Sequence, residues 1–138
     1  MKKIIIIIGL VVIVVIAITF NYIFKSNEVN TITEITIYKL AAKELFSKFE
    51  EDELKANELY LNKIIEVSGR IDQVKRNLDN EPVIILKEES EMFGIVCTLK
   101  QNIALNESTV GKHVKIKGLC QGYLTDVIIN NCIILNYY

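Results

Sequence analysis

Residues 64–73 have the sequence IIEVSGRIDQ, in which apolar and polar side chains alternate. Successive side chains of a β-strand point to opposite faces, so this alternation predicts a strand with one buried and one solvated face. Gly69 interrupts the apolar side of the pattern, which favours a tight bend or a bulge at that position. The fold is therefore expected to be built on strands from residue 64 onward.

Four further strands are expected to follow the first. They are separated by turn residues at 77–82 (NLDNEP), by an acidic loop at 88–91, by a longer connection at 100–111 with room for a helical turn, and by a turn at 121–125. Five short strands in so small a domain favour a closed barrel, because closure removes sheet edges that the chain could not cover. The expected strands are residues 83–87, 93–99, 113–120 and 126–135.

The segment before the strands has a helical period. Between residues 37 and 63, apolar side chains recur at helical spacing, and lysines and glutamates fill the other face. The acidic run at residues 50–53 is suited to end one helix and open another, since carboxylates favour a helix N-terminus. One long helix, or two helices with a kink near this run, is expected to lead into the barrel.

The N-terminus carries an apolar run at residues 4–24. At 1.5 Å per helical residue this run spans about 30 Å, which matches the hydrocarbon core of a bilayer. A cleaved signal peptide, the alternative, would have a shorter apolar run followed by a small-residue cleavage pattern. No cysteine precedes Cys97, which excludes a lipid-bearing N-terminal cysteine. We expect an uncleaved single-pass anchor at residues 1–25 and a polar tether at 26–36.

Charge predicts the orientation and limits the partners. Lys2 and Lys3 precede the apolar run, while Lys25 and then acidic residues follow it, so the positive-inside rule places the N-terminus in the cytoplasm and exports the domain. From residue 26 onward there are 13 Lys/Arg and 17 Asp/Glu, which leaves a net charge near −4. An acidic domain has no general attraction for phosphate backbones, so a nucleic-acid ligand is not expected.

The ordered motifs resemble a known family. These motifs are DELKANELYLNK at residues 52–63, VSGRI at 67–71, Val96-Cys97, VKIKGLCQG at 114–122, Asp126-Val127 and Cys132. In this combination the chain resembles the tRNA_anti-like OB-fold family over about residues 40–134. The resemblance implies an α+β fold in which an amphipathic helix (37–63) leads into a five-stranded OB-type barrel (64–138). It also implies membrane attachment, since members are often small lipoproteins or anchored proteins, and it implies no established activity. A hydrophobic helix replaces the lipidated cysteine here.

Several motif residues are assigned structural roles. Asp126 is expected to accept backbone N–H bonds in the turn that precedes the last strand. Asn57 and Tyr60, with Lys63, lie on consecutive helical turns and are expected to form a hydrogen-bonded joint between helix and barrel. Glycines complete the structural set. The set is Asn57, Tyr60, Gly69, Gly118, Gly122 and Asp126.

The three cysteines leave alternatives open. Cys97, Cys120 and Cys132 contain no C-x-x-C element, so zinc and redox-motif roles have little support. Cys97 and Cys120 alternate with apolar neighbours and are expected to point inward as small buried hydrophobes. In an exported domain, two of the three could instead form a disulfide, and the third would remain a thiol.

No residue set indicates catalysis, a cofactor or a metal site. His113, the single histidine, has no base partner that the sequence places near it. The candidates for ligand contact are Arg70, Lys115, Lys117 and Tyr123, because Lys115 and Lys117 share an outward face and aromatic side chains are few in the barrel. The leading hypothesis is an exported binding module for a protein, peptide or envelope polymer. The second is a membrane-tethered nucleic-acid binder that faces the cytoplasm.

Overall fold

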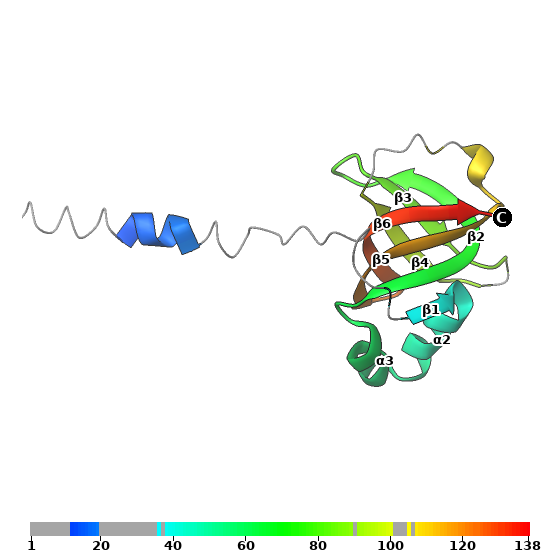
Figure 1. Cartoon of the computed structure of the whole chain (residues 1–138), viewed down its shortest axis with the longest axis horizontal. Coiled ribbons are helices and arrows are strands. Elements are labelled where there is room, and N and C mark those ends of the chain that lie inside the picture. The colour runs from blue at the N-terminus through cyan, green and yellow to red at the C-terminus, as the bar shows by residue number, and fades with distance from the viewer. Residues whose placement is uncertain (1–11, 20–35, 37, 90, 101–104, 106) are drawn as a thin grey trace, which may run out of the picture.

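Five strands close into a barrel, with two short helices at one end (Figure 1). The computed structural model describes residues 12–19, 36, 38–89, 91–100, 105 and 107–138. Beyond a helical segment at residues 12–19, the elements are β1 (Tyr38–Ala41), α2 (Ala42–Glu51), α3 (Glu53–Tyr60), β2 (Ile64–Arg76), β3 (Pro82–Leu86), β4 (Ile95–Leu99), the 3-10 turn η1 (Glu107–Thr109), β5 (His113–Tyr123) and β6 (Val127–Tyr137).

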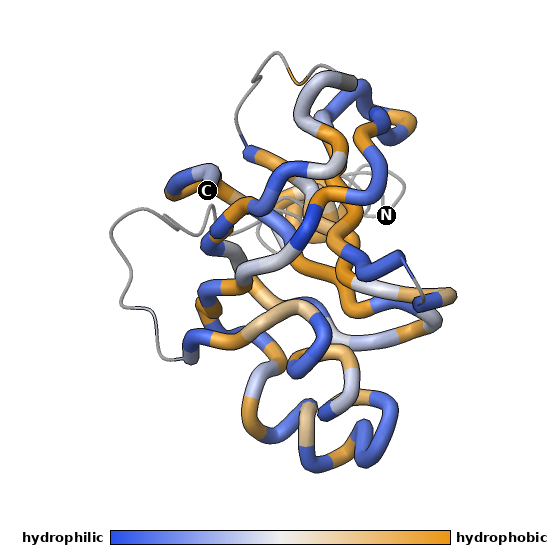
Figure 2. The backbone as a smooth tube through the Cα atoms, turned by 90° about the vertical axis from the view of Figure 1, so that its right-hand side faces the viewer, coloured by the Kyte–Doolittle hydropathy of each residue, from blue (hydrophilic) through white to orange (hydrophobic). Residues whose placement is uncertain are grey.

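The strand order is that of a Greek-key barrel. Around the barrel the order is β2-β3-β4-β6-β5, and β5 pairs with β2 to close it. The pair β4–β6 is parallel, whereas the other pairs within the barrel are antiparallel. Hydrophobic and hydrophilic residues alternate along the strand traces in Figure 2. The predicted five-stranded barrel of the OB type is confirmed.

The segment expected to be helical begins with a strand. β1 lies parallel to β2, with Tyr38 opposite Ile65 and Ala41 opposite Ser68. Four residues are too few to reveal a strand period, and the partner strand lies more than twenty residues away. The kink at the acidic run is confirmed: α2 ends there, and the Asp52 carboxylate caps α3 by accepting the N–H of Lys55 at 3.0 Å.

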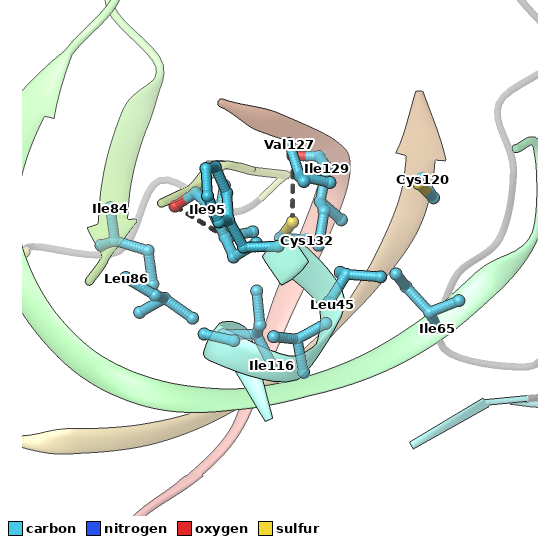
Figure 3. Close-up of a cluster of buried hydrophobic side chains, with 14 of the residues drawn as sticks. Leu45, Ile65, Ile84, Leu86, Ile95, Ile116, Cys120, Val127, Ile129 and Cys132 are labelled. Carbon is cyan, nitrogen blue, oxygen red and sulfur yellow. Dashed lines mark hydrogen bonds between the residues drawn. The ribbon is translucent and has the colours of Figure 1, made fainter. Parts of the chain in front are cut away.

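Helix α2 closes one end of the barrel. Leu45 and Phe49 on its inner face are almost completely buried. Figure 3 shows Leu45 among the core side chains of the strands, near Ile65 and Ile116. Burying a leucine side chain is worth about 1.5–3 kcal/mol. The apolar stripe read from the sequence therefore acts as a plug for the barrel.

Gly69 serves this plug and not a bulge. The register shift in β2 falls two residues later, between Ile71 and Gln73. A Cβ atom on Gly69 would lie 2.8 Å from the Cβ of Ala42 in the first turn of α2. The bulge predicted as one alternative at Gly69 is therefore wrong, and the tight bend, the other alternative, stays a prediction. The glycine is needed for the close approach of the helix.

The last hairpin is tighter than expected. β5 runs on to Tyr123, which pairs with Val127, so the turn shortens from residues 121–125 to residues 124–126. Gly122 has a φ of 107° and sits opposite Ile128, where the register between β5 and β6 shifts. A residue without a side chain lets the strand continue through this irregularity.

The proposed anchor and tether fall largely outside the described residues. Of residues 1–36, the structure describes the helical segment 12–19 and Thr36. Among the described residues, no helix is both long enough and apolar enough to cross a membrane.

Candidate functional site

Three of the four ligand candidates come together on one outer surface of the barrel. Pairing of β2 with β5 sets Arg70 opposite His113, Ser68 opposite Lys115 and Glu66 opposite Lys117. β1 extends this surface, with Lys39 beside Glu66. We call it the cationic face. Its members are Lys39, Glu66, Ser68, Arg70, His113, Lys115 and Lys117.

Carboxylates position the cations of this face. Glu66 lies 3.6 Å from the Nζ atoms of both Lys39 and Lys115, and Glu89 lies 3.0 Å from Arg70. Lys117 is only 8% exposed. A depression of about 250 Å³ is lined by the charged side chains of Lys39, Glu44, Glu66 and Lys115, together with Ser68. Lysines and glutamates balance there, so the acidic net charge of the whole domain does not extend to this face and does not alone decide against an anionic partner.

Tyr123, the fourth candidate, lies elsewhere. Its ring stacks on Phe49 at 5.9 Å and meets Phe46 edge-on at 5.9 Å. Tyr60 adjoins the same cluster, 6.0 Å from Phe49, and burial, followed by the nearby Glu44 and Tyr38, raises the pKa of its hydroxyl. Tyr123 thus packs α2 onto the barrel.

A second surface was not found from the sequence. Gln73, Ile85, Val96 and Ile128 stand in register across β2, β3, β4 and β6. Their strand neighbours Ile84, Cys97 and Ile129 are fully buried, so these four side chains point out of the barrel. We call them the outer row. Its three apolar members are only half-buried.

The outer row has defined borders. Lys75 is exposed beside it, and Lys87 pairs with Asp72 at 3.3 Å. The β2–β3 turn is held by the Asn77 side-chain oxygen, which accepts the N–H groups of Asp79 at 3.0 Å and Glu81 at 2.8 Å. A sequence signal for this row existed, because residues 83–86 are apolar at every position and do not alternate.

Asp126 accepts a backbone N–H, although not in its own turn. Its Oδ1 accepts the N–H of Gly94 at 2.7 Å, and the N–H of Val127 donates to the Gly94 carbonyl at 3.0 Å. Gly94 begins the approach to β4, so these two bonds join the start of β4 to the start of β6. The predicted acceptor role is right, and the predicted location of the donor is wrong.

Replacing Asp126 by alanine is expected to lower the free energy of unfolding by about 1.5–3 kcal/mol, since the Gly94 N–H loses a charged acceptor. Asp126→Asn keeps an oxygen at the same place and is the matched control, with a smaller loss. Urea unfolding of the full chain in detergent, followed by circular dichroism, measures both. Equal midpoints for Asp126→Ala and the unmodified chain would rule out this role.

The helix-to-barrel joint is made by backbone groups. Asn62 donates to the Cys120 carbonyl at 2.9 Å, and the Cys120 N–H donates to Lys63 at 3.0 Å. The buried side-chain oxygen of Asn57 has no hydrogen-bond partner and lies 3.5 Å from where a Gly122 Cβ would be. The expected joint exists at this place, but the Asn57 side-chain oxygen does not bond in it.

All three cysteines are buried free thiols. Burial, together with a hydrogen bond to the Cys132 thiol, raises the pKa of Cys97 well above its ordinary value. Burial also raises the pKa of Cys120, which lies apart from Cys132 (Figure 3). A disulfide stays a prediction, and Cys97 with Cys132 is the pair in contact.

Two further residues complete the set of sequence candidates. Gly118 faces β6, where an added Cβ would lie 2.5 Å from Ile129 Cγ2 and 2.6 Å from the Cys132 sulfur. His113 packs its ring 5.5 Å from that of Tyr138. In the part of the chain that the structure describes, no group of three or more His, Cys, Asp or Glu side chains could hold a metal ion.

Comparison with known proteins identifies one family and a solved structure with a similar fold. The tRNA_anti-like family matches residues 1–134. The crystal structure of a lipoprotein of Klebsiella pneumoniae, to which nucleic-acid binding has been ascribed, is similar with a TM-score of 0.52 at 17% identity, over 70% of this chain and 91% of that one. The yeast Stn1 and Ten1 structure has a TM-score of 0.47 at 19% identity, over 78% of this chain and 66% of that one. No curated protein matches the chain.

Proposed function

The chain belongs to the tRNA_anti-like family, and we propose that it is a membrane-anchored, non-enzymatic OB-fold module that binds an extended peptide or glycan chain outside the cytoplasm. The ligand crosses the strands along the outer row. OB folds bind oligomers on the surface of their second and third strands, which are β3 and β4 here. The binding is non-covalent, and no cofactor takes part.

The apolar N-terminus supports the anchor. The helical residues 12–19 carry exposed Val and Ile side chains, which need an apolar surrounding. The polar side chain of this segment, Thr19, donates its hydroxyl to the Val15 and Ile16 carbonyls, both at 3.0 Å. Internal satisfaction of polar groups is what a bilayer demands of a helix. Lys2 and Lys3 support a cytoplasmic N-terminus and an exported barrel.

The outer row is the observation that carries the binding proposal. On a solvated sheet face, outward positions are normally polar. The β2–β5 surface follows this rule with Glu66, Ser68 and Lys115, whereas β3, β4 and β6 of the same barrel present Ile85, Val96 and Ile128. Apolar side chains aligned across strands provide a track that an extended chain can follow.

The chemistry of the row favours a ligand with apolar surface. Gln73 offers hydrogen bonds at one end and Lys75 adds a cation beside it. A single-stranded nucleic acid needs aromatic rings for its bases to stack on, and the four members of the outer row include none. Nucleic acid is the second candidate, favoured by the ligand ascribed to the Klebsiella lipoprotein. Protection of the domain from protease added to intact cells would favour that candidate.

Methyl NMR of the full chain in lipid nanodiscs tests the proposal. Pools of peptides, envelope glycan fragments and single-stranded oligonucleotides are added in turn. We expect peptides or glycans to shift the methyl signals of Ile85, Val96 and Ile128. Val96→Asp is expected to weaken the binding about tenfold or more, equivalent to about 1.4 kcal/mol. Val110→Asp, at an exposed valine away from the row, is the matched control and leaves affinity unchanged.

Two outcomes would overturn the proposal. If oligonucleotides alone shift the outer-row methyl signals, the second candidate replaces the first. If a ligand class binds while these three signals stay in place, the binding surface has been assigned to the wrong strands.

A further inference from the structure

A narrow slot lies between helix α2 and the connection from β3 to β4. Ala42, Phe46 and Leu86 form the buried part of its lining, and Phe93 adds an aromatic side chain that is 38% exposed. The volume of the slot is about 40 Å³. One water molecule needs about 10–15 Å³, so the slot has room for roughly three groups of that size. This is too little for a nucleobase or a sugar ring, and it fits an unbranched aliphatic chain.

The backbone fixes the strand side of the slot. The N–H of Lys87 donates to the Arg70 carbonyl at 3.1 Å, and the N–H of Gly94 donates to Asp126 Oδ1 at 2.7 Å. A Cβ atom on Gly94 would collide with the carbonyl oxygen of Leu86, so the two ends of the connection approach closely. A site whose walls are already in place loses little free energy to ordering when a ligand binds.

Both lysines in the lining already have carboxylate partners. The Nζ atom of Lys43 lies 3.2 Å from Glu91, which also lines the slot. The Nζ atom of Lys87 lies 3.3 Å from Asp72, which does not line it. These two ammonium groups therefore offer little attraction to an anionic ligand.

Two carboxylates of the lining remain. Glu50 near the end of α2 and Glu88 just after β3 are exposed, and neither has an ion pair with any residue that the structure describes. From residue 26 onward there are 13 Lys/Arg and 17 Asp/Glu, so the domain as a whole also attracts cations. A lysine side chain buries its aliphatic stem against apolar groups and keeps its ammonium group at a polar rim. The slot has both of these parts.

The slot lies close to the outer row. Ile85 pairs with Val96 in that row, and the next pair along the two strands is Leu86 with Ile95. Leu86 lines the slot together with Gly94, two residues before Val96. One or two residues along a strand are about 3–7 Å. An extended chain on the outer row can therefore place one side chain in the slot.

We propose that the slot receives a lysine side chain of the peptide bound along the outer row. The inference rests on the proposed function and narrows its ligand to a lysine-bearing peptide. The aliphatic stem packs against Phe46 and Phe93, and the ammonium group pairs with Glu50 and Glu88. A glycan or a nucleic acid has no such side chain.

The test adds three peptide pools to the full chain in lipid nanodiscs. The peptides have about six residues, the length that crosses four strands about 4.8 Å apart. Their sequences are randomised except for a central lysine, norleucine or glutamate. We expect each pool to shift the methyl signals of the outer row, and the lysine pool alone to shift the amide signals of residues 91–94. The lysine pool should bind about threefold more tightly than the norleucine pool, a ratio within the range of exposed ion pairs. High salt should reduce this ratio, and the glutamate pool should bind most weakly.

A double variant tests the two carboxylates. Glu50→Gln/Glu88→Gln should lower the affinity for the lysine pool to that for the norleucine pool. Glu53→Gln/Glu58→Gln makes the same charge change on α3, outside the slot, and is the matched control. The control should keep the preference for lysine.

The results separate the two proposals. If no peptide pool and no glycan fragment shifts the outer-row signals, the proposed function fails and the slot inference with it. If glycan fragments alone shift them, the proposed binding surface stands and the slot inference is wrong. Equal affinities for lysine and norleucine, or an equal loss of the preference in both double variants, would also refute the slot inference alone.

Discussion

Leu45→Ala is expected to lower the free energy of unfolding of the barrel by about 2–5 kcal/mol. Leu45 is fully buried among the strand side chains at the end of the barrel, so truncation leaves a cavity with walls from α2 and several strands. A domain of this size has a total stability of about 5–15 kcal/mol, and the loss is therefore a large fraction of it. Urea unfolding of the full chain in detergent, followed by circular dichroism, gives the difference.

Leu54→Ala is the matched control, because Leu54 lies on the neighbouring helix α3 and is 81% exposed. Its free energy of unfolding should stay within about 0.5 kcal/mol of that of the unmodified chain. Equal effects of the two substitutions would mean that α2 does not plug the barrel.

Gly69→Ala is expected to cost about 1–3 kcal/mol by overpacking. The added methyl would lie 2.8 Å from the Cβ of Ala42 and 3.4 Å from that of Leu86, so α2 must move away from β2. The same unfolding measurement applies. This substitution tests the contact between α2 and β2 by a change in the strand.

The control removes the methyl group of Ala42, which the methyl group added at residue 69 would contact. Ala42→Gly alone should cost about 0.5–1 kcal/mol. In the double variant Gly69→Ala/Ala42→Gly the closest contact is relieved, so the total loss should be smaller than the sum of the single losses. Strict additivity would show that the two positions do not touch.

Alternation predicted the barrel well, because each strand has one face in the core. The pattern of Ile65, Val67 and Ile71 is enough to identify β2, and these side chains are fully buried. The strand β1 was missed, since only its parallel register with β2 makes four residues a strand. The residues around β1 do not include its partner strand β2, so the local pattern could not predict the pairing.

The surfaces were harder to predict than the core. Lys115 and Lys117 were expected on one outward face from their spacing, and they do lie on the same side of β5, but Lys117 is only 8% exposed. Arg70 joins them because β2 pairs with β5 in one register, which alternation within a single strand cannot determine. The donor to Asp126 lies 32 residues away for the same reason.

Tyr123 was predicted to contact a ligand but packs against α2, whereas the outer row was not predicted as a surface. Tyr123 was a ligand candidate because aromatic rings are rare in the barrel, yet the helix uses it for packing. Ile85 and Val96 were predicted only as strand residues. Continuous apolar runs are typical of strands that are buried on both faces. We propose that the ligand covers the outer face of these strands.

Both surfaces depend on the strand order, and interstrand NOEs test it most directly. The outer row needs β4 beside β6, and the cationic face needs β2 beside β5. We predict backbone NOEs between Val96 and Ile128 and between Val67 and Ile116 in the same protein. Strands paired only in chain order, with β4 beside β5 and neither of these contacts, would contradict both assignments.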